Sequence, residues 1–399
     1  MTQEIQVTVK PDFVEAYKKG YPLISKESIV SWESVKEEGS VLKLVDEKGK
    51  FILKAYHGVQ NKGYGWALST KKDEKVDSTF FTKKIESALE YRKEFFANES
   101  TTAFRVLNGE GDGLGGLTID YFDGFYLLTW YSLGIYEFKA DILKALKKSV
   151  DYKGIYQKKR FDSKGKYLDE KDDFICGEKA PEPLLVKESG ANFAIYLDDG
   201  AMVGVFLDQR DVRKTIRDKY AKGKTVLNTF SYTGAFSIFA ALGGSSKTTS
   251  VDLAKRSLPK TTEQFKVNNI DVQKQDIIVE DVFNYFKYAV KKNLLFDMVV
   301  LDPPSFARSK KRTFSASKDY VNLLKEAIQI TKKGGIIVAS TNSANFSMMT
   351  FSDFISKAFK ELKGRYEVKE RFSLPKDFKI SKKFQEGNYL KVVFIKKVK

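Results

Sequence analysis

Three carboxylates stand at or just after short segments in the second half of the chain that we interpret as strands. Asp252 ends the second of these strands, Asp281 follows the third, and Asp302 follows the fourth. Parallel strands of an open α/β sheet present their carboxyl ends to ligands at one edge, so we expect these side chains to lie along that edge. A carboxylate after the second strand can accept both ribose hydroxyls, and one after the third can accept from the exocyclic amine of adenine. The spacing therefore predicts binding of an adenine nucleoside.

The segment before these carboxylates reads as a strand, a tight loop and a helix. A short apolar run leads into a loop of small and aromatic residues, and an apolar helix begins after Gly234. Glycine lets the backbone of such a loop approach a ligand closely. The dinucleotide glycine fingerprint and the phosphate-binding loop are both absent, so we expect a ligand that is not held by its phosphates. The candidate contacts are Asn228, Phe230, Tyr232 and Gly234.

Asp302 also opens an Asp-Pro-Pro-Ser-Phe turn, which has the residue types of a base-binding pocket. The prolines stiffen the turn, and Phe306 offers a face on which a base can stack. Asp302 and Asn342, which follows a later apolar run, can hydrogen-bond the edges of a base. We therefore predict Asp302, Asn342 and Phe306 as catalytic residues, with Asp302 and Pro303 also facing the bound nucleoside.

Four cations follow this turn, and they suit the phosphates of a nucleotide that has been flipped out of its strand. A flexible charged loop is the alternative interpretation. The predicted nucleic-acid contacts are Arg308, Lys310, Lys311 and Arg312.

The motifs together resemble those of class I S-adenosylmethionine-dependent methyltransferases. The resemblance rests on four segments: 228–234 (NTFSYTG), 251–252 (VD), 280–283 (EDVF) and 302–306 (DPPSF). More narrowly, the chain resembles bacterial 23S rRNA methyltransferases that carry an N-terminal PUA domain and act on cytosine C5. This resemblance implies S-adenosyl-L-methionine as methyl donor, S-adenosyl-L-homocysteine as product, and ribosomal RNA as partner.

The resemblance also implies a fold and further contacts. The expected fold is α/β, with a C-terminal Rossmann-like methyltransferase domain built on a seven-stranded sheet. A β-barrel PUA-like domain and a small α+β middle domain precede it, which places the boundaries at 1–72, 73–182 and 183–399. A segment similar to the one that closes over the cofactor in this family assigns Gln209 and Arg210 to cofactor binding. The first PUA-like loop assigns Lys19 to RNA binding.

One position departs from the cytosine-C5 family. Enzymes that methylate cytosine C5 first add a cysteine thiolate to the ring, and Asn342 stands where that family has its cysteine. Cys176 is the single cysteine of the chain, and we expect it to be a buried structural residue. Methylation of guanine N7 or another nitrogen is therefore an alternative to cytosine C5. A non-catalytic RNA-binding or ribosome-assembly factor is an alternative of another class.

Composition limits the partners and the location. The 399 residues carry a formal net charge of +17, and such a basic chain typically has a polyanionic partner. One histidine and one cysteine argue against a metal site. No run of apolar residues is long enough to span a membrane, and the first residues lack signal-peptide character, so we expect a cytoplasmic protein. The sequence leaves the oligomeric state open, with a homodimer as one option.

Overall fold

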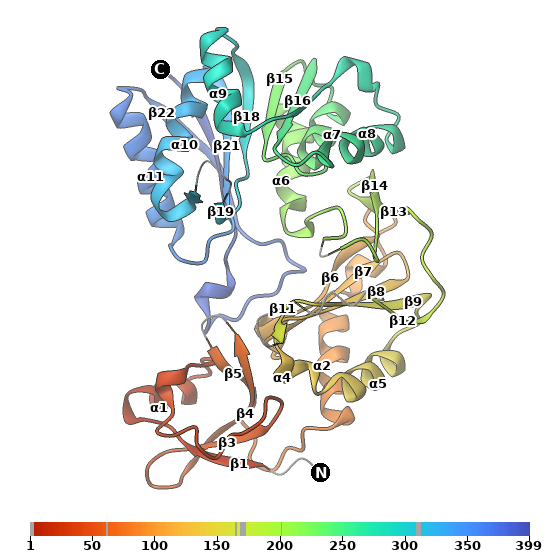
Figure 1. Cartoon of the computed structure of the whole chain (residues 1–399), viewed down its shortest axis with the longest axis vertical. Helices are drawn as coiled ribbons and strands as arrows, with labels where there is room; N and C mark the ends of the chain where they lie inside the picture. The colour runs from red at the N-terminus through yellow and green to blue at the C-terminus, as the bar shows by residue number, and fades with distance from the viewer. Residues whose placement is uncertain (1–3, 61–62, 164–165, 168–172, 201, 309–312) are drawn as a thin grey trace. The chain divides into compact units, whose positions relative to one another are not determined.

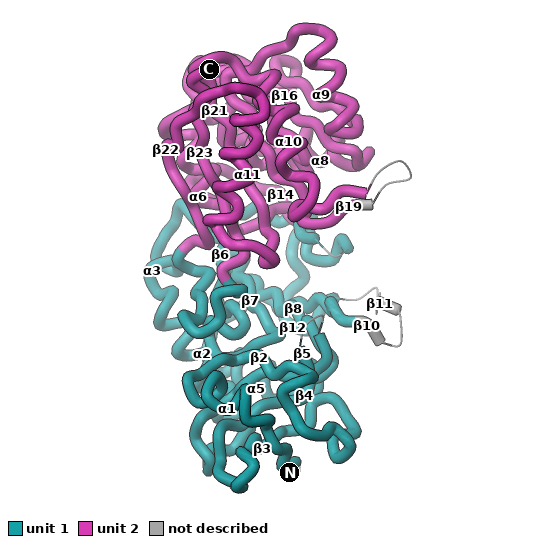
Figure 2. Tube along the Cα trace, turned by 90° about the vertical axis from the view of Figure 1, so that its left-hand side faces the viewer, with its two compact units in different colours: residues 1–186, 196–203, 376–387 teal, residues 187–195, 204–375, 388–399 magenta. Residues whose placement is uncertain are grey.

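The computed structural model divides the chain into two compact units, each described here by itself (Figure 2). Unit 1 comprises residues 1–186, 196–203 and 376–387, and unit 2 comprises residues 187–195, 204–375 and 388–399. The described residues are 4–60, 63–163, 166–167, 173–200, 202–308 and 313–399. The division into three contiguous domains stays a prediction. The first two predicted domains both fall in unit 1, which also takes residues 183–186, 196–203 and 376–387 from the predicted third domain.

The N-terminal part of unit 1 is a five-stranded sheet with one helix, α1 (Pro11–Lys18), as expected for a small PUA-like β domain. Pro11 stands at the start of α1, where its missing N–H costs nothing, and Lys18 lies in the last turn, where its charge suits the helix dipole. The strands, in sheet order, are β1 (Ile5–Thr8), β3 (Val41–Val45), β4 (Phe51–Gln60), β5 (Gly63–Ser69) and β2 (Leu23–Ile24).

A second five-stranded sheet with helices follows in unit 1. Asp77 is the N-cap of its longest helix, α2 (Ser78–Tyr91). The carboxylate of Asp77 accepts from the N–H groups of Thr79 and Phe80 at 3.0 Å each. The strands, in sheet order, are β12 (Phe174–Gly177), β9 (Gly154–Lys159), β8 (Phe125–Trp130), β7 (Leu117–Phe122) and β6 (Ala103–Asn108). The other helices are α3 (Lys93–Phe96), α4 (Leu133–Tyr136) and α5 (Lys139–Ser149).

Residues 376–387 complete unit 1 although they come from near the C-terminus. The carboxylate of Asp377 accepts from the N–H of Arg105 at 2.9 Å, and the carbonyl of Lys379 accepts from the side-chain amide of Asn108 at 2.9 Å. Phe384 is buried in the same core. These contacts attach the segment to unit 1 and satisfy the backbone N–H of Arg105 and the backbone carbonyl of Lys379.

Unit 2 contains the predicted seven-stranded sheet, with its first five strands parallel and β23 antiparallel to both of its neighbours (Figure 1). The strands, in sheet order, are β17 (Asp276–Val279), β16 (Lys247–Asp252), β15 (Thr225–Thr229), β18 (Phe296–Leu301), β21 (Thr331–Thr341), β23 (Lys391–Lys397) and β22 (Tyr366–Phe372). Central strands such as β18 are almost continuously apolar because both of their faces are covered.

Helices cover both faces of this sheet and leave one edge for the loops (Figure 1). On one face pack α9 (Val282–Lys291), α10 (Ala316–Ile330) and α11 (Met348–Glu361). On the other face pack α6 (Arg210–Thr215) and α7 (Ala235–Leu242). The helix α8 (Ser257–Val267) contacts the short strand β14 (Ala191–Ile195), which pairs with β13 (Leu184–Glu188). The result is the three-layer arrangement expected from the sequence.

Candidate active site

The three predicted carboxylates come from neighbouring parallel strands. Asp252 ends β16, Asp281 follows β17, and Asp302 follows β18. These strands flank β15 in the order β17, β16, β15, β18, and all of them run parallel. Their carboxyl ends therefore lie along one edge of the sheet, where open α/β folds bind ligands.

The loop after β15 adopts an unusual backbone conformation. Phe230, Tyr232 and Gly234 have φ angles of 55°, 50° and 78°, all in the left-handed region. A Cβ on Gly234 would also lie 2.5 Å from a methyl carbon of Thr261, so this position needs glycine. Left-handed conformations at two aromatic residues cost energy and persist only where surrounding contacts hold them.

Asp252 supplies such a contact. One of its carboxylate oxygens accepts from the N–H of Tyr232 and the other from the N–H of Ala254, each at 2.8 Å. A carboxylate has about four acceptor positions, so Asp252 keeps capacity for two further donors. Its side chain is only half-buried, which leaves the carboxylate open to a ligand.

The other loop residues occupy different environments. Asn228 is fully buried, and its amide donates to the hydroxyl of Ser237 at 3.0 Å while its side-chain oxygen has no partner among the described residues. Asn228 therefore supports the loop from inside the unit, and its role in cofactor binding stays a prediction. The ring of Tyr232 lies 5.4 Å from that of the half-exposed Phe206, at the ligand edge.

Asp281 caps the helix α9. One of its oxygens accepts from the N–H groups of Phe283 and Asn284, at 2.9 and 3.2 Å. Its second oxygen makes no hydrogen bond with any residue in the described ranges. Helix capping accounts for an aspartate at this position, and the free oxygen remains able to accept from an amine.

Asp302 lies at the centre of a hydrogen-bonded cluster. The side-chain amide of Gln209 donates to Asp302 at 2.7 Å and to the hydroxyl of Ser340 at 2.9 Å. Burial is the main cause that raises the pKa of Asp302 from 3.8 to about 6, and the nearby carboxylate of Asp208 acts in the same direction. Hydrogen bonds from Ser340 and Gln209, and the charge of Arg213, lower this pKa and offset part of the rise.

Sequence reasoning missed the residue that supports this cluster. Arg213 is buried and forms two hydrogen bonds of 2.7 Å with the carboxylate of Glu188 and one of 2.6 Å with the carbonyl of Phe206. It therefore fixes the segment that carries Gln209. No local sequence pattern predicts the ion pair between Arg213 and Glu188, because the two residues lie on different elements, α6 and β13. Arg210 is also buried, with its Nε 4.0 Å from the carboxylate of Asp211.

The residues assigned to the target base lie on the loops after β18 and β21. The hydroxyl of Ser305 donates to the side-chain oxygen of Asn342 at 2.5 Å, so these two loops meet. Pro303 is buried under the turn, whereas Phe306 is 64% exposed. The structure thus brings Asn342 to the Asp-Pro-Pro turn and leaves an aromatic face free beside it. Lys391 holds the second loop by donating to the carbonyl of Ser343 at 2.9 Å.

Comparison with known proteins decides the family. A family model described as S-adenosylmethionine-dependent methyltransferase matches residues 105–380, more than half of the chain. The chain belongs to this methyltransferase family. A model of the PUA-like domain matches residues 7–70 of the same methyltransferase.

Relatives and solved structures match the methyltransferase over nearly its whole length. YwbD of Bacillus subtilis, named provisionally as a ribosomal RNA large subunit methyltransferase, is 56% identical over 98% of this chain and 99% of its own. Ribosomal RNA large subunit methyltransferase I of Pseudoalteromonas translucida is 30% identical over 96% of each chain. A methyltransferase crystallised with SAH is 38% identical, with a TM-score of 0.90 over 98% of this chain and 99% of its own. A SAM-dependent methyltransferase from Streptococcus mutans is 37% identical, with a TM-score of 0.89 over 98% and 100%.

The residues at the sheet edge fit the methyl donor that defines the family. Asp252 retains acceptor capacity for ribose hydroxyls, and the second oxygen of Asp281 can accept from the adenine amine. The glycine at position 234 keeps the adjoining backbone free of a side chain. Within the described ranges, no cluster of histidine, cysteine and acidic residues could hold a metal ion, and no helix is long and apolar enough to cross a membrane.

The predicted RNA contacts receive only partial structural description. Lys19 lies exposed just after α1, with its ammonium 3.3 Å from the carboxylate of Glu15. Arg308 ends the short strand β19 (Phe306–Arg308), which pairs with β20 (Thr313–Ser315). The prediction for Lys310, Lys311 and Arg312 falls outside the described residues.

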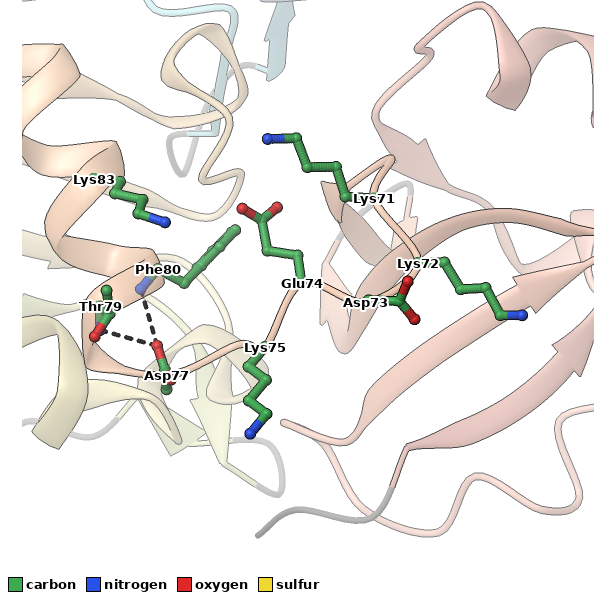
Figure 3. A pocket seen from close by; sticks show the side chains of 9 residues that line it. All are labelled: Lys71, Lys72, Asp73, Glu74, Lys75, Asp77, Thr79, Phe80 and Lys83. Atoms are coloured by element: carbon green, nitrogen blue, oxygen red, sulfur yellow. Dashed lines mark hydrogen bonds between the residues drawn. The ribbon is translucent and has the colours of Figure 1, made fainter.

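Unit 1 offers further lysines that the sequence analysis did not single out. An open pocket of about 580 Å³ lies where β5 leads into α2 (Figure 3). Four exposed lysines border it and form no ion pair with a described residue, whereas the Glu74 carboxylate near its centre accepts from the hydroxyl of Ser69. These lysines are Lys71, Lys72, Lys75 and Lys83.

Proposed function

We propose that this methyltransferase transfers a methyl group from S-adenosyl-L-methionine to a base of 23S ribosomal RNA and releases S-adenosyl-L-homocysteine. The observation that carries the proposal is full-length similarity to two proteins named as ribosomal RNA large subunit methyltransferases. The net charge of +17 and the PUA-like domain agree with an RNA substrate.

The site residues would act mainly by positioning. S-adenosyl-L-methionine supplies an activated methyl group, and transfer then requires a nucleophile held in line with it. The base would stack on the exposed ring of Phe306, donate a hydrogen bond to the carboxylate of Asp302, and donate to or accept from the side-chain amide of Asn342. Gln209 and Ser340 hold the carboxylate of Asp302 in one orientation, which limits the freedom lost when the base binds.

The target atom we propose is a nitrogen, with guanine N7 as the first choice. Methylation of cytosine C5 requires a thiolate, and Asn342 cannot supply one. Cys176 belongs to unit 1, where it lies on β12 and packs against the core. It is half-buried, whereas the sequence predicted a buried residue. Cytosine C5 is the second candidate, because the motifs resemble enzymes of that specificity.

Two further expectations belong to this proposal. A protein that modifies ribosomal RNA works where ribosomes are assembled, which in bacteria is the cytoplasm. A homodimer also stays a prediction, which light scattering on the purified protein would test.

Nucleoside mass spectrometry of 23S RNA from a deletion strain tests the proposal. The strain should lack one methylated base, and wild-type protein should restore it. Asp302→Ala should restore little of it, because the carboxylate that orients the base is removed. Asp353→Ala, which removes an exposed carboxylate on α11, is the matched control and should restore the mark fully. Unchanged nucleosides in the deletion strain would refute the proposed substrate.

A further inference from the structure

A second groove in unit 1 differs in chemistry from the rest of this basic chain. It has a volume of about 520 Å³ and lies among α2, α3, β7, β8 and the turn after α5. Three aromatic rings form a row along it, with centroids 5.2 Å apart for Phe96 and Tyr121 and 5.3 Å apart for Tyr121 and Tyr126. Phe96 is 40% exposed, so part of this aromatic surface is open to a ligand.

Carboxylates stand on the rim of this groove. Glu86, Glu90 and Asp151 all border it and are exposed. Glu90 pairs with Lys93, the groove's single cation. Glu86 and Asp151 form no ion pair with any residue of the described part of the chain. The groove therefore carries an excess of negative charge, although the net charge of the chain is +17.

Two polar side chains of the groove also have no partner within the described ranges. Tyr126 is only 2% exposed and lines the groove, yet its hydroxyl makes no hydrogen bond there. The hydroxyl oxygen of Ser149 is completely buried and has none either. Native proteins rarely leave a buried hydroxyl such as that of Ser149 unsatisfied. The hydroxyl of Tyr126, whose side chain lines the groove, is able to form a hydrogen bond with an occupant.

We propose that this groove binds a lysine or arginine side chain from a basic segment of a protein partner. Aromatic faces attract a cation within about 6 Å of the ring centre, and the unpaired carboxylates of Glu86 and Asp151 would neutralise its charge. The free hydroxyls would accept its N–H groups. RNA does not suit the groove, because the same carboxylates repel phosphates. This surface goes beyond the proposed function and does not depend on it.

Fluorescence anisotropy with the full chain tests the proposal. The probe is a rhodamine-labelled peptide of alternating lysine and glycine, and a glutamine–glycine peptide measures binding due to the dye. Glu86→Gln combined with Asp151→Asn should weaken binding of the lysine peptide roughly tenfold, through loss of two ion pairs. Glu33→Gln combined with Glu37→Gln removes two exposed, unpaired carboxylates elsewhere in unit 1 and should change affinity less than twofold.

Two further measurements test whether the peptide binds in this groove. Tyr126→Phe should weaken binding several-fold and leave the circular dichroism unchanged, because only the hydroxyl is removed. In the wild type, the lysine peptide should slow hydrogen exchange in the backbone around Tyr121, Tyr126 and Ser149. Equal affinity of both charge variants for the peptide would overturn the proposal. Protection of this segment by a short RNA, with none from the peptide, would also overturn it and assign the groove to RNA.

Discussion

Replacing Asp302 with asparagine should stabilise the unliganded methyltransferase although it impairs methyl transfer. Burial is the main cause that raises the pKa of the Asp302 carboxyl from 3.8 to about 6, because the charged form is disfavoured away from water and beside Asp208. A gap of about 2 pKa units corresponds to roughly 3 kcal/mol of destabilisation once the group is ionised. Asparagine has the same shape and keeps an oxygen that can accept from Gln209.

The difference in stability between Asp302→Asn and the wild type should depend on pH. Below pH 3.8 the carboxyl is protonated in both the folded and the unfolded protein, so Asp302→Asn should change stability little. As the pH rises from about 4 to 6, the wild type loses stability that the variant keeps, because the unfolded protein ionises first, and the difference should be complete above about pH 7. Thermal unfolding between pH 4 and pH 8 measures this, with about 2–4 °C expected per kcal/mol for a unit of this size.

Methyl-transfer assays on the same samples should show the opposite order, because asparagine offers the base one acceptor fewer. Asp353→Asn is the control, since its exposed carboxylate on α11 should show no such pH-dependent gain. The reasoning fails if Asp302→Asn is no more stable than wild type at pH 8. It fails equally if the gap between the two proteins is the same at pH 4 and pH 8.

The remaining predictions concern the methyl donor, the RNA and the mechanism. Asp252→Ala should weaken binding of S-adenosyl-L-homocysteine by about 1–3 kcal/mol, since two ribose donors lose their acceptor; unchanged affinity in calorimetry would contradict this assignment. Changing Lys310, Lys311 and Arg312 together to glutamine should lower the slope of log affinity for RNA against log salt, by about 0.7 for each single-strand phosphate that these cations neutralise in the wild type. An equal slope would mean that these cations do not bind phosphates. Cys176→Ser should keep methyl transfer, and a covalent adduct with RNA containing 5-fluorocytosine would show that the target is cytosine C5 after all.

The edge of the sheet could be predicted because its signals are local. Asp281 and Asp302 follow short apolar runs, and such runs become the buried parallel strands of an α/β sheet. Asp252 ends a strand that is rich in threonine and serine. Once the strands are parallel and adjacent, their carboxyl ends meet without further information. The sequence could also place Gly234 at the start of a helix, where the structure requires a left-handed backbone.

The support behind that edge could not be predicted, because it depends on contacts between distant residues. Glutamine is usually a surface residue, and only the folded structure shows that the side chain of Gln209 donates to Asp302. Arg213 and Glu188 are charged residues that composition assigns to the surface, yet both are buried as a pair. Residues 376–387 belong to unit 1 and contact it at Arg105 and Asn108. No hydrophobic periodicity within residues 376–387 predicts these contacts.

The site contains two features that cost free energy in the unliganded protein. The loop after β15 holds Phe230 and Tyr232 in left-handed conformations, and β18 delivers Asp302 into surroundings that oppose its charge. Neither feature helps the unliganded protein to fold, so each needs a compensating contact. Asp252 anchors the loop through the N–H of Tyr232, and Gln209 donates to the carboxylate of Asp302. Because a cationic centre or a base amine beside Asp302 would stabilise its charged form, binding of such a ligand would relieve the cost that burial places on this carboxylate.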